Sequence, residues 1–352
     1  TKYIKPYLPF AILSPLLMIG EVMADLCLPY LMSFIVDFGI ADNGLTKILE
    51  NSFASGVMNL LFGEGLYTRM HVIVTFGVMM LIITLIGGFF GTFCAYAAAR
   101  ASQGYGNDLR CDAYRRVMSL SIEQTDRFTT GSLVTRMTGD IAMLVEFVEM
   151  LLRMFVRAPV FLIGGTVMLL TLNIKFGTVL LCALPVLLIS LILVLSRAVP
   201  LYSVVQNKLD RVNAVVQENV SGSRVVKAYV REEYENDRFN CANGELRDVN
   251  YRVLKLMSVL HPTMNIVQNL AILAIIALGG MAISEGVDVM SRGVLMAGVN
   301  YVTSILHSVM MVTMMFQSVS RAMASGKRIR EVLDTEPVIS DGPGRGEETG
   351  DV

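Results

Sequence analysis

The stretch from Ser119 to Asp140, SLSIEQTDRFTTGSLVTRMTGD, decides the fold because it is polar and charged yet lies between two long apolar segments. A second polar block, VKAYVREEYENDR from Val226 to Arg238, lies between two later apolar segments in the same way. A helix needs about 20 apolar residues to cross a bilayer core, and long apolar runs of this kind flank both blocks. The pattern predicts that both blocks are the tips of long helical hairpins that project from a membrane.

The composition agrees with a membrane protein. Hydrophobic residues make up 54% of the 352-residue chain and charged residues only 17%, which is too apolar for a soluble globular protein of this length. The formal net charge is −1, so the charge balance gives no support to a nucleic-acid partner. The five cysteines show no CxxC or other metal-ligand spacing, and we expect neither a metal site nor catalytic residues in this chain.

Six apolar segments are predicted to span the membrane, which makes the fold class an all-α membrane protein. The first segment runs from Pro6 to Val36 and is interrupted only by Glu21 and Asp25. Charge-free runs cover residues 71–99, 158–174, 176–196, 256–284 and 293–320. Only four of the 29 Lys and Arg residues fall in loops on one side, namely Lys47, Arg69, Lys175 and Arg292. The positive-inside rule therefore predicts a multi-pass protein of the cell membrane with both termini in the cytoplasm.

Two of the spans are predicted to continue as helices beyond the membrane. Apolar residues recur at helical spacing after the second span, at Leu109, Ala113, Val117 and Leu120, and after the fourth, from Val205 to Val220. A helix from His71 to Leu120 would be on the order of 75 Å long, against a bilayer core of about 30 Å. The Thr129–Ser132 stretch is expected to turn the first hairpin back and to cap the next helix.

The motifs at these positions give the chain a specific resemblance. The tips DRFTTGSLVTRMTGD and ENVSGSRVVKAYVREEYENDRF, the first-span pattern GEVMADLCLPYLMSFIVDFGI and the late SGKRIREVLDTEP resemble the transmembrane domain of an ABC exporter of the multidrug half-transporter type. The resemblance covers nearly the whole chain. It implies a six-helix transmembrane domain over residues 1–333, and a flexible linker over residues 334–352 that leads toward a nucleotide-binding domain.

The resemblance also implies residues that couple the membrane domain to the nucleotide-binding domains. The first coupling helix would be Ser121–Phe128 and the second Glu232–Phe239, with Phe128 and Tyr234 as the aromatic side chains that dock. The implied coupling residues are Ser121, Glu123, Asp126, Arg127, Phe128, Glu232, Glu233 and Tyr234.

The chain departs from the family pattern in one respect. It contains no G-x-x-x-x-G-K-[ST] phosphate loop, and GPGRGEETGDV near its end lacks the required lysine. We therefore interpret the chain as the membrane part of a longer protein. ATP and Mg²⁺ would bind in the nucleotide-binding domain of that protein and not in this chain, which would work as a homo- or heterodimer.

Several residues are candidates for the substrate pathway. Met311, Met314 and Met315 could form an adaptable wall for apolar ligands, although ordinary packing is an equally simple reading. Asn265, Gln268 and Asn269 would face either a neighbouring helix or a water-filled cavity. His307 is expected to make a helix–helix hydrogen bond. Gly87, Gly88 and Gly91 are expected to let helices pack closely.

Glu21 and Arg157 are predicted to form an ion pair within the membrane. Each lies the same number of residues from the outer end of its span, about 24 Å along the helix axis. Asp25 lies one turn from Glu21 on the same face. The alternatives are that Arg157 extends to the headgroups while Glu21 is hydrated or protonated, or that Glu21 and Asp25 bind a cationic substrate.

The expected function is that of the membrane half of an ATP-driven exporter, which works by alternating access on lipophilic or multidrug substrates. A dedicated exporter of a lipid, peptide or metabolite is the main alternative, because a fold does not determine its cargo. A six-span channel or secondary transporter would leave the extended helices and the polar tips unexplained.

Overall fold

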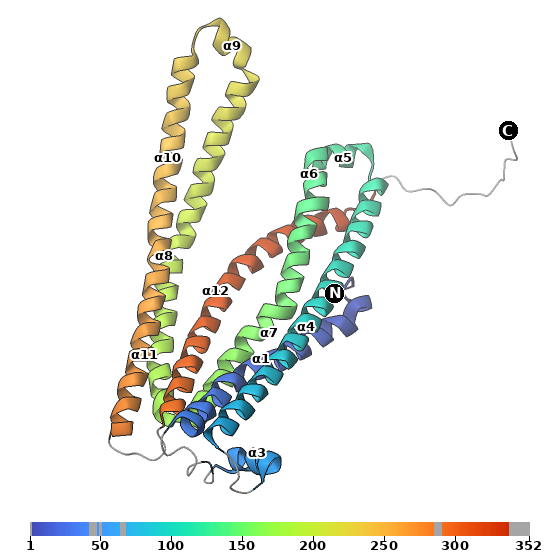
Figure 1. The fold of residues 1–352 in the computed structure, drawn as a ribbon. Helices are drawn as coiled ribbons and strands as arrows, with labels where there is room; N and C mark the ends of the chain where they lie inside the picture. Colours follow the sequence, from blue (N-terminus) through green and yellow to red (C-terminus); the bar gives the residue numbers. More distant parts are fainter. Residues whose placement is uncertain (1, 42–47, 49–50, 64–67, 285–290, 338–352) are drawn as a thin grey trace, which may run out of the picture. The chain divides into compact units, whose positions relative to one another are not determined.

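The computed structural model describes residues 2–41, 48, 51–63, 68–284 and 291–337 (Figure 1). Within these ranges, the side chains of residues 126, 127, 313, 314, 316, 317 and 320 lie outside the description. The described residues are organised as helices, and none of them belongs to a strand. The contacts divide the chain into two compact units, Thr1–Leu172 with Val287–Val352, and Asn173–Gly286, which we describe separately.

The helices confirm the predicted class of all-α membrane protein. Six stretches of the described chain are long and apolar enough to cross a membrane. They are Lys5–Ile40, Arg69–Ser119, Thr130–Leu172, Ile174–Ser221, Glu232–Ser284 and Arg292–Val312. Each overlaps one of the six apolar segments found in the sequence.

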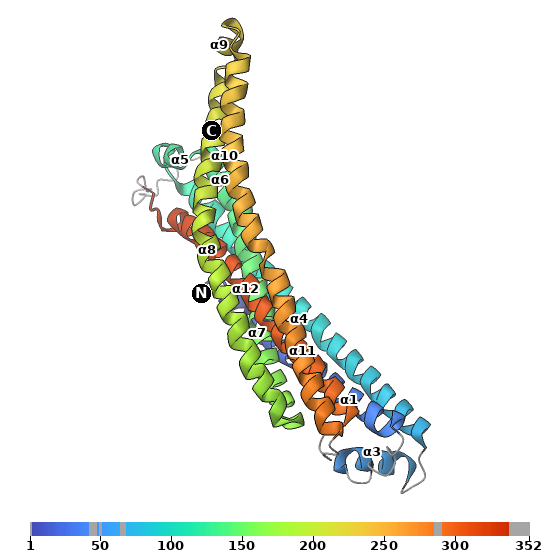
Figure 2. The same ribbon diagram turned by 90° about the vertical axis from the view of Figure 1, so that its left-hand side faces the viewer.

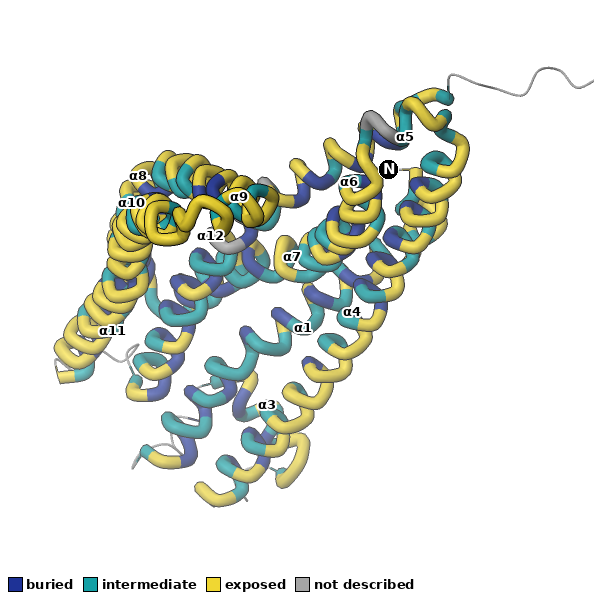
Figure 3. Tube along the Cα trace, turned by 90° about the horizontal axis from the view of Figure 1, so that it is seen from above, coloured by how far each residue is buried: buried dark blue, intermediate teal, exposed yellow. Residues whose placement is uncertain are grey.

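The first unit contains four spanning helices and the first hairpin tip. The spanning helices are α1 (Leu8–Phe34), α4 (Arg69–Ser119), α7 (Ile141–Leu172) and α12 (Arg292–Asp334), and each of them packs against the others. Small buried residues of α4, among them Ala97, Ala98 and Ala101, let its neighbours approach closely. Figure 3 shows that much of the opposite side of α4 is exposed, as expected for a surface in contact with lipid.

The first hairpin has the predicted length and turn. Helix α4 extends over 51 residues without interruption, so its length is on the order of 75 Å. It is followed by a short tip helix, α5 (Ile122–Phe128), by α6 (Thr130–Thr135) and by the π-helical segment η3 (Arg136–Asp140), which leads into α7. Thr129 has a positive φ of 58°, and its side chain accepts a hydrogen bond from the Ser132 amide, so this threonine caps α6.

The second unit consists of the other long hairpin. Helix α8 (Ile174–Ser221) leads to the short α9 (Ser223–Ala228), and the chain returns through α10 (Glu232–Ser258) and α11 (Leu260–Ser284). Figures 1 and 2 show α10 and α11 running beside α8. Val212 and Val215 of α8 pack against Ala242 of α10, and the Glu245 carboxylate binds Lys208 at 2.7 Å and Arg211 at 2.9 Å.

The short helix at the second tip begins nine residues before the segment that was predicted to form it. The short helix at the tip is Ser223–Ala228, whereas Glu232–Phe239 forms the first turns of the long α10. Gly222 ends α8, and Val230 adopts a positive φ of 52° that turns the chain before α10 begins. Glu232, Glu233 and Glu235 lie in the first turn of α10, where the helix dipole favours negative charge.

Candidate functional site

A cluster of three charged side chains lies among the spanning helices of the first unit. One guanidinium nitrogen of Arg157 on α7 binds the Glu21 carboxylate of α1 at 2.5 Å, and the other binds Asp25 at 2.9 Å. The predicted pair of Glu21 and Arg157 is therefore confirmed. Asp25 completes the cluster because it lies one helical turn from Glu21 on the same face of α1. Both ion pairs are partly screened from solvent, with Glu21 17% exposed and Arg157 28% exposed.

Helix α4 closes the cluster from a third side. The carboxylate of Glu21 lies so close to Gly91 that a Cβ atom there would come within 3.0 Å of it. A Cβ atom at Gly87 would likewise come within 3.2 Å of Ala24, which confirms close packing at these two glycines. At Gly88 a Cβ would meet nothing within 4 Å, so close packing does not explain this third glycine. Gly88 instead lines a hollow together with Glu21, Asp25 and Arg157.

Arg157 also borders two further hollows in the first unit. One, of about 400 Å³, is lined by thioether and charged side chains, namely Met18, Glu146, Glu149, Met150, Arg153, Met154, Arg157 and Met311. The other, of about 240 Å³, lies between α7 and α12 and is lined by Phe161, Thr303, Ser304, His307, Ser308 and Met311 as well as Arg157. The guanidinium of Arg157 lies 5.5 Å from the centre of the Phe161 ring. An apolar ligand with a polar group could be held on these walls.

The remaining pathway candidates divide into different environments. Met311 borders both of these hollows, whereas Met315 is only 4% exposed and packs in the interior. The side chain of Met314 lies outside the described part of the chain. His307 is exposed beside the smaller hollow instead of making the expected helix–helix hydrogen bond. In the second unit, Asn265 and Asn269 lie on the exposed face of α11 and Gln268 is half-buried.

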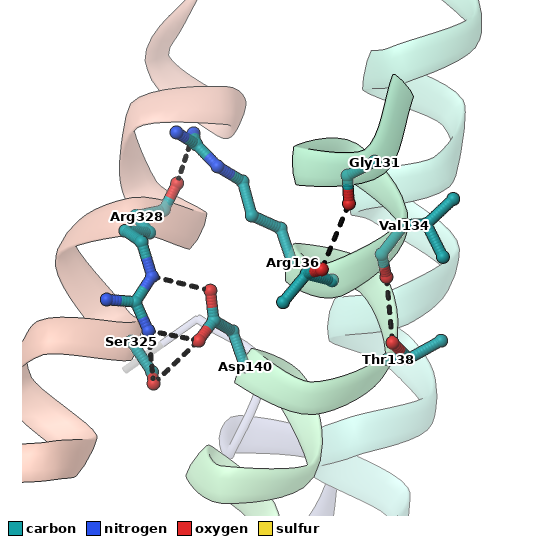
Figure 4. A network of polar contacts seen from close by, with 8 residues as sticks. Gly131, Val134, Arg136, Thr138, Asp140, Ser325 and Arg328 are labelled. Atoms are coloured by element: carbon teal, nitrogen blue, oxygen red, sulfur yellow. Dashed lines mark hydrogen bonds and ion pairs between the residues drawn. The ribbon is translucent and has the colours of Figure 1, made fainter. Parts of the chain in front are cut away.

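A second cluster of charges lies near the first hairpin tip (Figure 4). Asp140, at the end of η3, is only 5% exposed and accepts hydrogen bonds from the Ser325 hydroxyl at 2.8 Å and from Arg328 Nε at 2.7 Å. A second nitrogen of Arg328 also binds this carboxylate. The hydrogen bond to Asp140 raises the pKa of Arg328 above its ordinary value, because it stabilises the charged guanidinium.

The same region joins the tip to the end of α12 through backbone carbonyls. Arg136 donates to the carbonyl oxygen of Arg328 at 3.0 Å and binds the Glu331 carboxylate at 3.1 Å. Arg116 of α4 donates to the carbonyl of Leu333 at 3.1 Å. Gln124 of α5 donates to the carbonyl of Glu336 at 2.8 Å. The first hairpin and the end of α12 are therefore bound together at several points, which could not be expected from the sequence.

At the first tip, the predicted coupling residue Phe128 is less exposed than another apolar side chain, Ile122. Ser121 begins α5, with its amide and hydroxyl both donating to Gln124 at 3.1 Å, and Glu123 is exposed. The Phe128 ring lies 4.8 Å from the Arg136 guanidinium and is half-buried, whereas Ile122 is 83% exposed. The side chains of Asp126 and Arg127 lie outside the described residues.

The second tip presents more apolar surface than the sequence suggested. Tyr229 is 75% exposed and Val230 80%, both in the turn after α9. Tyr234, which was predicted to dock, is 60% exposed one turn into α10, and Glu232 and Glu233 are exposed at the start of that helix.

Comparison with known proteins shows which family this chain belongs to. The family model described as "ABC transporter transmembrane region" matches residues 11–320. The chain belongs to this family. It is therefore the membrane-spanning region of an ABC transporter and a multi-pass membrane protein.

Its similar proteins carry names of the same family. The chain is similar to the uncharacterized ABC transporter ATP-binding protein YfiB of Bacillus subtilis (strain 168), with 31% identity over 335 residues, 95% of this chain and 54% of that protein. It is 28% identical over 338 residues to the uncharacterized ABC transporter ATP-binding protein Rv1273c of Mycobacterium tuberculosis (strain ATCC 25618 / H37Rv), covering 96% of this chain and 53% of that protein. The chain thus spans about half the length of these relatives.

Proposed function

We propose that this chain is the membrane half of an ATP-driven exporter that works in a dimer by alternating access. The observation that carries the proposal is the network that fastens η3 of the first hairpin to the end of α12, through Arg136, Asp140 and Arg328. A membrane domain driven from outside the bilayer needs rigid levers and a contact point. The uninterrupted α4 and α8 are such levers, and α5 and α9 are the contact points.

The source of energy lies outside the chain in this proposal. The similar proteins are named ATP-binding proteins, and about half of their length has no counterpart here. ATP and Mg²⁺ bind in nucleotide-binding domains that contact the two hairpin tips. Both tips and both termini then lie in the cytoplasm and the membrane is the cell membrane, in agreement with the bias of Lys and Arg.

The substrate class follows from the walls around Arg157. Thioether groups and the Phe161 ring supply adaptable apolar surface, while the cluster of Glu21, Asp25 and Arg157 fixes a polar group. Lipophilic and multidrug substrates fit this combination. The polar amides of α11 are further candidates for the same pathway.

The proposal is tested at the tips in the full-length protein. Ile122→Ala and Tyr229→Ala remove the most exposed large apolar side chain of α5 and an exposed aromatic ring of the second tip. Both variants are expected to retain ATP hydrolysis and to lose most of the transport that hydrolysis drives, since the docking contact is lost and the motor is left intact. Phe128→Ala and Tyr234→Ala test, in the same assay, the two aromatic side chains that the sequence predicts to dock.

The control for these variants is Ile174→Ala, which removes an equally exposed apolar side chain, 77% accessible, at the start of α8 and therefore at the far end of that helix from its tip. It should transport like the parent protein. Transport at the parental rate by both the Ile122→Ala and the Tyr229→Ala variants would show that the tips do not couple.

A further inference from the structure

A short helix between the first two spans is unusually apolar for a loop. Helix α3 covers Ser52–Phe62 (SFASGVMNLLF) and contains no charged side chain. Both of its ends are well defined. Asn51 accepts hydrogen bonds from the amides of Phe53 and Ala54, and Gly63 ends the helix with a positive φ of 81°. Figures 1 and 2 show α3 lying across the ends of α1 and α4.

One side of α3 is packed on the protein. Ala54 and Met58 are fully buried in an apolar cluster with residues of α1, of the π-helical segment η2 (Ile35–Ile40) and of α4, including Phe34, Val72 and Phe76. This contact fixes the rotation of the helix about its own axis. The other residues of α3 must therefore point in directions that the 3.6-residue period determines.

A second apolar side remains exposed. Leu60 is 86% exposed, Leu61 58% and Phe53 48%, and with the half-buried Val57 they follow one another around the helix. The small and polar residues gather on the remaining side, where Ser52 and Gly56 are exposed and Ser55 and Asn59 are half-buried. The helix is thus amphipathic even after its contact with the protein is counted.

The exposed apolar side continues into the surface that contacts lipid. The Phe62 ring stacks on His71 in the first turn of α4, with 4.6 Å between ring centres. Met70 and Val74 of the same helix are 67% and 51% exposed, at the start of the apolar surface that α4 presents to the membrane. The neighbouring surface is therefore apolar and belongs to a helix that is long and apolar enough to span the membrane.

We infer that α3 is an interfacial helix that binds the surface of the bilayer at this end of the spanning helices. It lies in the plane of the membrane, with Phe53, Leu60 and Leu61 inserted about 5–10 Å into the boundary between headgroups and acyl chains. Ser52 and Gly56 face water. Because α3 has no basic residue, this contact depends on apolar burial and not on the charge of the lipid headgroups.

The sequence offers a direct probe, because this chain contains no tryptophan. Leu60→Trp places a tryptophan on the exposed apolar side. Ser52→Trp is the matched control, at an exposed position about 80° around the helix from Leu60 and on the side opposite Leu61. The full-length variants are reconstituted in phosphatidylcholine vesicles that contain a phosphatidylcholine brominated near the headgroup end of its acyl chains. The parent protein, treated identically, supplies the background emission to subtract.

The added tryptophan at position 60 is expected to emit at shorter wavelength and to be strongly quenched by the brominated lipid, and the one at position 52 to emit as in water with little quenching. The same quenching is expected when part of the lipid is replaced by anionic phosphatidylglycerol. Emission at short wavelength without quenching would mean that protein covers this side, as in contact with a second copy, and would overturn the inference. Equal behaviour at the two positions, or quenching only with anionic lipid, would overturn it as well.

Discussion

Arg157 is the residue on which the intramembrane cluster depends. Its single guanidinium serves two carboxylates, Glu21 and Asp25, through separate nitrogens. Removing either acid leaves the arginine with a partner, whereas removing the arginine leaves two acids side by side in a spanning region. A charge without a partner near the bilayer centre costs at least about 2.5–3.5 kcal/mol, although these groups lie nearer one interface.

This asymmetry predicts the order of stability among neutral variants. Arg157→Gln should lower the free energy of unfolding by about 1–3 kcal/mol, because two acceptors lose their donor. Glu21→Gln should have a smaller effect, since Asp25 still binds the arginine. Thermal unfolding of the purified protein in nanodiscs measures both. Arg153→Gln is the control, because its pair with Glu149 is longer, at 3.6 Å, and more exposed, and it should change stability by less than about 1 kcal/mol.

A charge exchange tests the pair itself. Glu21→Arg should fold poorly, and adding Arg157→Glu should restore much of the stability, since the two groups lie within 2.5 Å of each other in the parent. A double variant as unstable as the two single changes combined would contradict the pairing.

Gly91 and Gly88 provide a second residue-scale prediction. Alanine favours a helix over glycine by up to about 1 kcal/mol, so Gly88→Ala, whose Cβ meets nothing within 4 Å, should be neutral or stabilising. Gly91→Ala should be less stable than Gly88→Ala, because its Cβ would press on the Glu21 carboxylate that Arg157 holds in place. Unfolding temperatures in nanodiscs compare the two. The difference should disappear in a Glu21→Ala background, and its persistence there would show that another contact causes it.

At the scale of the helices, paired and buried charges hold the first hairpin to the end of α12. Asp140 is almost inaccessible and receives hydrogen bonds from Ser325 and Arg328 of α12 (Figure 4). The backbone carbonyls near the end of α12 are bound by side chains of α4, α5 and η3. Any displacement of η3 should therefore move the end of α12 with it.

Substitutions of two arginines on α12 test how much this link contributes to stability. Arg328→Met leaves the buried Asp140 carboxylate without its main donor and should lower the unfolding free energy by about 1–3 kcal/mol. Arg330→Met, two residues away, breaks only an exposed pair with Asp334 and should change it by less than about 0.5 kcal/mol. Hydrogen exchange of α5 should rise in the first variant alone. Equal exchange in both variants would mean that Arg328 does not hold the tip.

The helices themselves were largely predictable from the sequence. The length of the apolar runs and the spacing of Leu109, Ala113 and Val117 predicted the spans and the extension of α4, because both depend on local periodicity. The ion pair of Glu21 and Arg157 was predictable because equal depth and opposite charge in a membrane leave few alternatives. The second tip was misplaced because its turn depends on the strained Val230, a residue whose type does not favour a positive φ.

The contacts between distant segments were not predictable in the same way. Nothing local distinguishes Met311, which borders two hollows, from Met315, which is buried one turn later. Asp140 and Arg328 are 188 residues apart, and a single sequence does not indicate that they meet. These features depend on how α7 and α12 pack, and that is decided by the sum of many weak contacts.

At the scale of the whole molecule, the central claim is that transport through this membrane domain is driven by ATP hydrolysed outside the chain. The membrane region of an ABC transporter is present, together with hairpins that extend far beyond a bilayer core. The relatives it resembles are about twice as long and are named ATP-binding proteins. A channel or an ion-coupled transporter would not need a hairpin that is bound to the end of α12.

The most direct test measures uptake of a lipophilic fluorescent probe by proteoliposomes that contain the full-length protein with its hairpin tips facing outward. Uptake should require added ATP and Mg²⁺, stop with a non-hydrolysable ATP analogue, and persist when ionophores collapse proton and sodium gradients. Uptake that an ion gradient drives in the absence of ATP would contradict the claim.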